Sequence, residues 1–222
     1  MTVLDVARAL PGTDDLRDHC RGLAMLDALL SPEWDGRYHS FDAHWGEGEQ
    51  MASMRDGEGG EYAIVFSAAG AYVRGFDHAS PMSPWARTDT PRVWPGVLDE
   101  VPDVFRPYAA EPAFCDDGVA AVTCCLWRGA DDTAWRTGAV TFPAGADGDP
   151  DGANALFGLL VDRSPEAYAA WASAYYETPV DVAAVRALLG GRPLTPEIVA
   201  ALNPDVDLAD LAEDVSEIGY ST

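Results

Sequence analysis

Short glycine-containing turns separate the apolar runs in the middle of this 222-residue chain, and they restrict how those runs can pair. Only residues 67–70 join the apolar run 62–66 to the next run, 71–76. A parallel pair of strands needs a crossover of about a dozen residues, whereas antiparallel neighbours need only a tight turn. Gly70 suits such a turn because glycine readily adopts a positive φ. The two runs are therefore predicted to form an antiparallel hairpin.

Further runs extend this hairpin into a sheet. Residues 49–56 end in a glycine-rich turn, and residues 138–142 are predicted to pair back onto the sheet. Residues 119–127 are apolar almost throughout, without the alternation that marks a sheet face exposed to water. We expect this run to be a central strand with both faces covered. Together these segments predict an antiparallel meander of about five or six strands.

Helical signals flank the predicted sheet. Thr13 is a suitable N-cap for a helix that ends at Ser31, because a residue before proline is pushed out of the α region. Beyond residue 151, four residues with N-cap chemistry mark further helix starts: Ser164, Asp181, Thr195 and Asp207. Residues 1–222 are thus predicted to form a single α+β domain. Its helical parts cover residues 1–33 and 151–222, and its sheet covers residues 34–142.

A proline-rich insertion interrupts the predicted sheet. Residues 78–112 contain seven prolines and two tryptophans, Trp85 and Trp94. A short helix is expected over residues 97–109, where Pro102 weakens the pattern because proline has no amide hydrogen to donate.

The charge of the chain separates classes of partner. It contains no lysine, and its 14 arginines face 37 carboxylates, which gives a formal net charge of −23. Such a charge repels phosphate backbones and anionic membranes and attracts cationic surfaces. We therefore expect no nucleic acid and no membrane as partner, and a basic protein is favoured. Residues 1–10 lack the features of a signal peptide, and no run of 18 apolar residues occurs, which predicts a cytoplasmic protein.

Metal and cofactor chemistry have little support. Asp147, Asp149 and Asp151 occupy positions 1, 3 and 5 of a loop that begins like a calcium site. Position 12 is Gly158, where a bidentate glutamate is needed. The four cysteines lack the CxxC spacing of zinc sites, and Cys20, Cys124 and Cys125 lie in apolar patterns and are expected to be small buried side chains. We expect no metal and no cofactor, and a divalent-cation protein that uses the loop 147–151 is kept as an alternative.

His78 is the histidine with the best context for catalysis. It follows a carboxylate and opens the proline-rich insertion. Ser80 or Ser83, together with Asp99, supplies the other residue types of a Ser-His-Asp triad. No G-x-S-x-G motif accompanies them. A hydrolase-like or small-molecule-binding enzyme that uses the His78 loop is therefore a second alternative.

Tryptophan gives the strongest signal for binding. Of the seven tryptophans, Trp85 and Trp94 are the two most expected to be exposed. Exposed tryptophan beside arginine is typical of a binding surface. Five of the arginines in residues 34–142 are grouped with the tryptophans here: Arg37, Arg55, Arg74, Arg87 and Arg92. The candidate binding residues are His78, Trp85, Trp94, Arg55 and Asp99, and no catalytic residue is assigned.

Several segments carry a resemblance. They are RYHSF (37–41), EQMASMR (49–55), GFDH (75–78), WPGVLD (94–99), PAF (112–114) and PLTPEI (193–198). With these the chain resembles a family of uncharacterised bacterial proteins, which implies a cytoplasmic location but no reaction. In charge and size it is also similar to toxin-immunity proteins. These features favour a non-enzymatic, acidic protein-binding module, as an immunity-type or regulatory partner of a basic protein.

Overall fold

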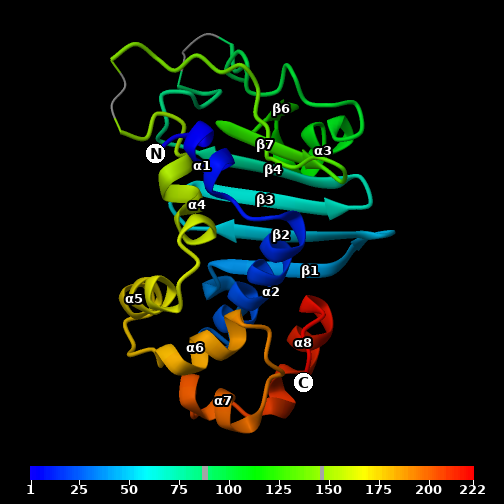
Figure 1. Ribbon diagram of the computed structural model, residues 1–222. Helices are drawn as coiled ribbons and strands as arrows, with labels where there is room; N and C mark the ends of the chain where they lie inside the picture. The colour runs from blue at the N-terminus through cyan, green and yellow to red at the C-terminus, as the bar shows by residue number, and fades with distance from the viewer. Residues whose placement is uncertain (87–89, 146–147) are drawn as a thin grey trace. The chain divides into compact units, whose positions relative to one another are not determined.

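The computed structural model describes residues 1–86, 90–145 and 148–222, and it shows an α+β protein (Figure 1). Within these residues, five strands form an antiparallel sheet in the order β1-β2-β3-β4-β7, and β5 and β6 form a second, two-stranded sheet. The predicted antiparallel sheet of about five or six strands is confirmed, with five strands in the main sheet. The strands are β1 (His39–Gly46), β2 (Glu49–Arg55), β3 (Gly60–Ser67), β4 (Gly70–Asp77), β5 (Cys115–Asp116), β6 (Val119–Ala120) and β7 (Cys124–Gly129).

Helices flank the strands at both ends of the chain, as predicted. The N-terminal segment contains α1 (Val3–Ala9), α2 (Thr13–Leu30) and the 3-10 turn η1 (Trp34–Gly36). The C-terminal segment contains α4 (Ala153–Val161), α5 (Pro165–Tyr175), α6 (Val182–Leu189), α7 (Pro196–Leu202), η3 (Leu208–Leu211) and α8 (Ala212–Ile218). Over the described residues, none of the helices is both long and apolar enough to span a membrane.

The chain divides into two compact units. The first unit comprises Met1–Thr13 and Ser53–Val161, and the second comprises Asp14–Ala52 and Asp162–Thr222. The boundary falls inside β2, so each unit contains both strands and helices. The assignment of residues 1–222 to a single domain stays a prediction.

The hairpin of β3 and β4 is confirmed. Ser67 pairs with Gly70 at the end of the ladder, so that only two residues form the turn. Gly70 has a φ of 125°, and a Cβ atom there would lie 2.1 Å from the carbonyl oxygen of Arg128. Glycine is therefore required both by the backbone angle and by the close approach of β7.

The apolar run 119–127 is not a central strand, and that prediction was wrong. Only its second half joins the main sheet, as β7, which stands at the end of the strand order beside β4. Val119 and Ala120 pair with β5 instead. Residues 121–127 are still buried, because both faces of this segment are covered. Along the outer edge of β7, Trp127 and Arg136 exchange main-chain hydrogen bonds. An apolar run thus indicates burial of both faces and not a central position.

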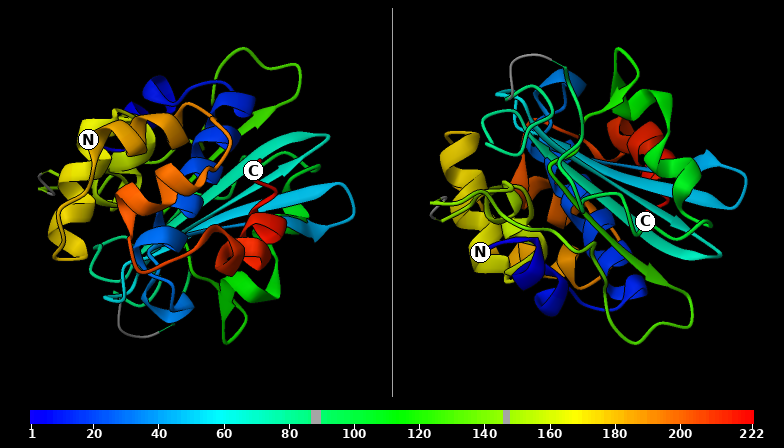
Figure 2. Two further views of the ribbon diagram at one scale, coloured as in Figure 1. Left: turned by 90° about the horizontal axis from the view of Figure 1, so that it is seen from below. Right: turned by 90° about the horizontal axis from the view of Figure 1, so that it is seen from above.

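The two faces of β7 contribute to different parts of the first unit's core. Cys124 and Phe157 of α4 both lie within 3 Å of the position that a Cβ atom of Gly75 would take. Cys125 belongs to a cluster on the other face, which is made by the insertion and the neighbouring strands: Tyr72, Met82, Val97, Val101, Phe105, Val122 and Trp127. Figure 2 shows α3 (Arg106–Ala109) on the opposite side of the strands from α1 and α4. The proline-rich insertion is therefore the second layer of this core.

Two further expectations for the first unit were wrong. The helix expected over residues 97–109 is reduced to α3, because Pro102 falls in the turns that precede it. Residues 138–142 form no strand; the bridge to β7 is made by Arg136 alone.

The helix starts of the second unit follow the predicted caps. Ser164 accepts a hydrogen bond from Ala167 N, Asp181 accepts one from Ala184 N at 2.8 Å, and the Thr195 hydroxyl accepts one from Ile198 N. Asp207 and Asp210 form a capping box around η3, and Gly219 ends α8 in the left-handed conformation. Local side-chain to backbone hydrogen bonds therefore set these boundaries.

Asp151 is a buried carboxylate that joins α1 to α4 in the first unit. It is fully buried, and its Oδ2 accepts a hydrogen bond from Val3 N at 2.9 Å while its Oδ1 accepts one from Ala153 N at 3.3 Å. Burial raises the pKa of Asp151, although these two amide donors lower it. The ionised form is therefore less favourable in the folded chain than in the unfolded chain.

This pKa predicts how an Asp151→Asn variant differs from the wild type with pH. Because the folded-state pKa is raised, the wild type loses stability as the pH rises through it, whereas asparagine carries no proton to lose. The quantity to follow is the unfolding free energy of the variant minus that of the wild type. We expect this difference to increase from pH 3 to pH 7. Urea denaturation at each pH measures this difference, and a difference that is constant or decreases would contradict it.

Candidate functional site

The five candidate binding residues all lie in the first unit, and the structure brings two of them together. Trp94 and Asp99 line the same pocket. Trp85 is half-buried and meets Phe76 edge to face, with 5.5 Å between the ring centroids. Arg55 is exposed at the end of β2. Arg87, which the sequence grouped with these residues, lies outside the described residues.

His78 is exposed, and no triad is assembled around it. Ser80 and Ser83 are both buried, and the Ser80 hydroxyl donates to the carbonyl oxygen of Pro150 at 2.7 Å. Asp99 accepts a main-chain hydrogen bond from its own loop. Within the described residues, no hydrogen bond joins His78 to either serine or to Asp99. The side chains of Ser80, Ser83 and Asp99 form hydrogen bonds with main-chain groups and so support the geometry of the insertion.

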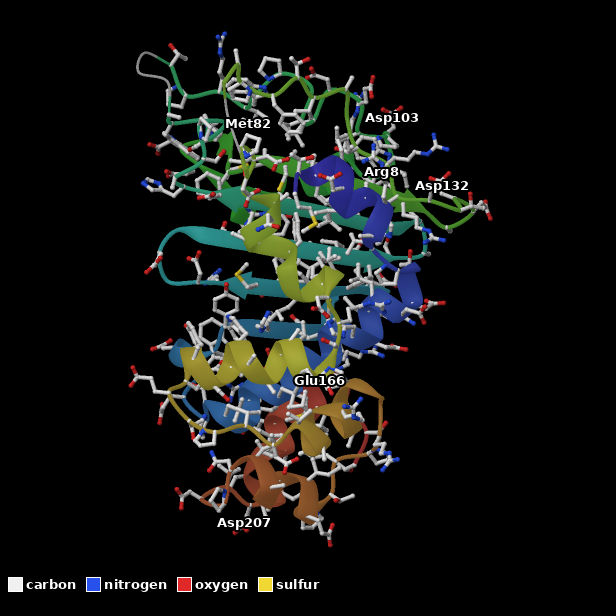
Figure 3. The ribbon with its side chains drawn as sticks, turned by 60° about the vertical axis from the view of Figure 1, so that its left-hand side comes forward. Arg8, Met82, Asp103, Asp132, Glu166 and Asp207 are labelled. Carbon is white, nitrogen blue, oxygen red and sulfur yellow. The ribbon has the colours of Figure 1, made fainter. Side chains whose placement is uncertain are left out.

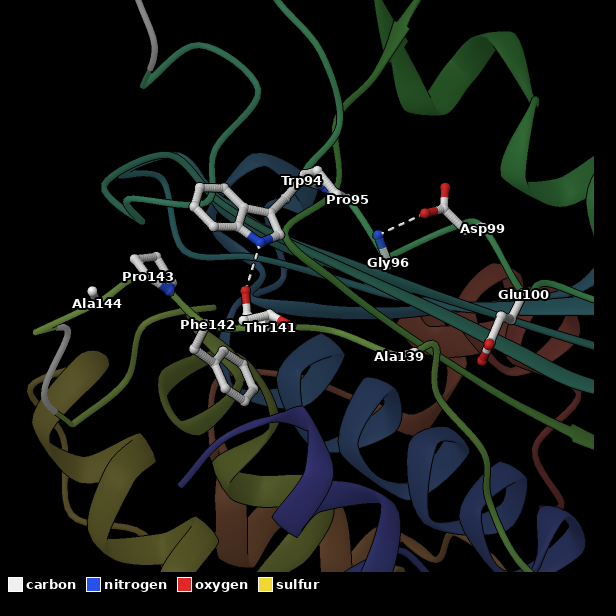
Figure 4. Close-up of a pocket in the computed structure, with 10 residues that line it drawn as sticks. All are labelled: Trp94, Pro95, Gly96, Asp99, Glu100, Ala139, Thr141, Phe142, Pro143 and Ala144. Atoms are coloured by element: carbon white, nitrogen blue, oxygen red, sulfur yellow. Dashed lines mark hydrogen bonds between the residues drawn. The ribbon is translucent and has the colours of Figure 1, made fainter.

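The pocket beside Trp94 has a volume of about 570 Å³ (Figure 4). Two loops of the first unit form it, one in the proline-rich insertion and one after β7. The Trp94 indole Nε1 donates to the carbonyl oxygen of Thr141 at 2.9 Å and so holds the ring between the loops. Figure 4 shows Trp94 and Phe142 at one end of the pocket and Asp99 and Glu100 at the other. The aromatic rings and the carboxylates provide apolar and negatively charged groups for binding a ligand.

The acidic loop 147–151 uses its described carboxylates to support local structure. Asp149 accepts hydrogen bonds from Asn154 N and Ala155 N, both at 2.9 Å, and so caps α4. Asp151 accepts a hydrogen bond from Val3 N of α1. Asp147 lies outside the described residues. In the described ranges, no group of three or more histidine, cysteine, aspartate or glutamate side chains has the arrangement of a metal site.

Three of the four cysteines are buried thiols with raised pKa values, and they are not ionised near neutral pH. All four are free thiols, and Cys20, Cys124 and Cys125 are buried. Burial raises the pKa of Cys125 to about 12 and raises the pKa of the other two as well. Because the thiolate is the nucleophile, these three thiols are inert side chains of the core.

The most exposed tryptophan among the described residues is one that the sequence did not single out. Trp34 opens η1 in the second unit and is 56% exposed. The Arg37 guanidinium forms a two-pronged ion pair with Asp214 of α8 and donates to two main-chain carbonyls of the segment before Trp34. Trp34, Arg37, Asp214 and Glu217 line one narrow crevice. Arg37 and Asp214 are 177 residues apart, so no local pattern in the sequence reveals their contact.

A buried carboxylate joins three elements of the second unit. Asp27 of α2 is fully buried; its Oδ2 accepts a hydrogen bond from His39 N at 2.6 Å and lies 3.0 Å from His39 Nδ1. The Tyr168 hydroxyl of α5 donates to Asp27 Oδ1 at 2.5 Å. Burial raises the pKa of Tyr168 well above its usual value, and the Asp27 charge adds to the shift, so the hydroxyl remains a donor. The signal in the sequence that could have revealed this cluster is Asp27 itself, the one charged residue in the apolar segment 22–30.

Replacing Asp27 with alanine should destabilise the protein strongly. The change leaves buried polar groups on His39 and Tyr168 without their acceptor, which typically costs about 3–5 kcal/mol of unfolding free energy. The matched control is Asp18→Ala, an exposed carboxylate on the same helix, for which we expect a change within about 0.5 kcal/mol. Chemical denaturation measures both, and equal effects of the two substitutions would contradict the role given to Asp27.

Comparisons with known proteins identify no relative of this chain: no family model, no curated protein and no solved structure matches it. The resemblance to uncharacterised bacterial proteins stays a prediction. The features that bear on function are the fold, the charge, the pocket beside Trp94 and the crevice beside Trp34.

Proposed function

We propose that this protein is a non-enzymatic, cytoplasmic binding module for a basic protein, of the immunity or regulatory type. The observation that supports this proposal most is the charge of the second unit, which contains 20 carboxylates and only six arginines. A surface with so few compensating charges attracts cationic partners over a distance of about a Debye length, roughly 8 Å at physiological salt.

The excess charge is concentrated on the C-terminal helices. We call this region the acidic surface; its exposed carboxylates are Glu197, Asp205, Asp207, Asp210, Glu213 and Glu217. Figure 3 shows the Asp207 side chain pointing outward from these helices. Within the described chain, none of the six forms an ion pair; Asp214 is the carboxylate of this region that does. The charges of these six carboxylates are therefore not cancelled by ion pairs within the described chain.

Trp34 supplies an apolar anchor in the same unit. Its ring is largely exposed, and it shares a crevice with Glu217 of the acidic surface. Arg37 and Asp214 hold the Trp34 segment against α8, so the ring is positioned before any partner arrives. Tryptophan is enriched among the residues that contribute most to binding energy, and it also accepts cationic side chains over its face. Trp34 thus joins Trp85 and Trp94 as a candidate anchor.

Affinity capture followed by binding kinetics tests this function. The wild type should retain one basic protein, and the folded Trp34→Ala variant should lose it because the anchor is removed. With that protein as the probe, the association rate constant should fall steeply as salt increases, since screening weakens the attraction.

Charge-neutralised variants locate the attraction. The test variant carries four substitutions on the acidic surface: Asp207→Asn, Asp210→Asn, Glu213→Gln and Glu217→Gln. We expect the association rate constant to fall by about tenfold with little change in the dissociation rate constant. The control variant carries the same charge change on exposed carboxylates of the first unit: Glu58→Gln, Asp116→Asn, Asp117→Asn and Asp131→Asn. Equal effects of the two variants, or an association rate that ignores salt, would refute the proposal.

A further inference from the structure

We infer that the pocket beside Trp94 binds the cationic head group of an organic cation, with guanidinium as the preferred chemistry. The inference does not rest on the acidic surface or on Trp34, because the pocket lies wholly in the first unit and its ligand is a single charged group. At about 570 Å³ the pocket falls within the range of small-ligand sites, roughly 300–1,000 Å³.

The two loops that form the pocket are held together by their backbones. A Cβ atom on Gly96 would lie 2.5 Å from the carbonyl oxygen of Ala139, and one on Gly138 would lie 1.8 Å from the carbonyl oxygen of Gly96. Only glycine permits such an approach. The hydrogen bond from Trp94 to Thr141 crosses the same junction. The pocket is therefore a fixed feature of the fold and does not require a ligand to assemble it.

The aromatic end of the pocket suits a cation. Trp94 is half-buried, and its one donor is already occupied by Thr141, so the ring cannot turn away without losing a hydrogen bond. Phe142 lies at the same end (Figure 4). The face of an indole ring carries partial negative charge and attracts a cation within about 6 Å of its centre.

The polar end of the pocket selects the same charge. Asp99 and Glu100 are both exposed there, and the described lining residues include no arginine. Asp99 Oδ2 accepts a hydrogen bond from Gly96 N at 2.8 Å, which fixes this carboxylate beside the pocket. Glu100 takes part in no ion pair within the described chain. Anions are repelled by this pair of charges, and a neutral ligand leaves them unpaired.

Guanidinium fits these groups better than ammonium does. Its planar group stacks on an aromatic face and donates two parallel hydrogen bonds to a carboxylate, whereas ammonium acts as a point charge. The head group has two possible sources, a free small molecule or an arginine side chain of another protein. Both present the same chemistry to Trp94 and Glu100.

Calorimetric titration with defined probes tests the inference. Butylguanidinium should bind the wild type, butylammonium should bind more weakly, and uncharged pentanamide should not bind. Trp94→Ala and Glu100→Gln should each weaken butylguanidinium binding by about tenfold. Asp103→Asn is the matched control, because Asp103 is an exposed carboxylate of the same insertion that does not line the pocket. Trp94→Phe, which keeps a ring, should lose less affinity than Trp94→Ala.

A short peptide, acetyl-Ala-Arg-Ala-amide, identifies the source of the head group. Tighter binding of the peptide than of butylguanidinium assigns the pocket to a protein side chain, and equal or weaker binding assigns it to a free cation; either result supports the site. No binding of either probe at 20 mM, or an equal loss of affinity in Glu100→Gln and Asp103→Asn, would overturn the inference. Thermal melting of each variant confirms that it is folded. The Trp34 variant should bind these probes normally, so failure here is distinct from failure of the proposed function.

Discussion

Uncompensated negative charge is the constraint on which this structure depends. With 37 carboxylates and 14 arginines, folding brings like charges together, and their repulsion opposes a compact state. Arginine is the one basic residue type in the chain that is charged at all relevant pH values, and Arg74 shows how it is used in the interior. Arg74 is 5% exposed, donates to the carbonyl oxygen of Ala121 and to Glu61 at 2.6 Å each, and lies over the Phe114 ring at 4.5 Å. One guanidinium thus joins β3, β4 and the segment before β7.

The second unit uses arginine in the same way. Arg37 joins the Trp34 segment to α8 through Asp214, and its side chain is almost as well covered as that of Arg74. Among the residues that the structure describes, the outer carboxylates of α7, η3 and α8 then form no ion pair with an arginine. The arrangement that builds the unit is therefore also the one that leaves its outer surface strongly negative. Both the position of the Trp34 segment and the negative charge around it follow from this placement of few cations.

Local signals in the sequence predicted local structure well. The caps at Ser164, Asp181 and Thr195 and the turn at Gly70 are each set by groups within a few residues of one another. The sheet class followed from turns too short for a crossover. The place of β7 did not follow, because an apolar run records how much of a strand is buried and not which strand is beside it.

The sequence pattern did not predict the contacts between distant segments. Tyr168 and Asp27 are 141 residues apart, and Trp94 and Thr141 are 47 apart. The sequence separation of each pair is no different from that of many other residue pairs in the chain that make no contact. The sequence predicts Trp94 as an exposed tryptophan of the insertion and Asp99 as the acid of a triad. The pocket that they share depends instead on the close approach of Gly96 to residues 138–139. Trp34 was not predicted as a candidate, and the contact of Arg37 with Asp214 that joins its segment to α8 spans 177 residues.

The most direct measurement of the central claim is the stability of the isolated protein as a function of sodium chloride. If the carboxylates are left unpaired in the folded state, screening their repulsion should raise the unfolding free energy between 20 and 500 mM salt at pH 7. Sucrose at matched osmolarity serves as the control for effects of excluded solute. A free energy of unfolding that is unchanged or falls with salt would show that the carboxylates are balanced by ion pairs, and the attraction of a basic partner would lose its physical basis.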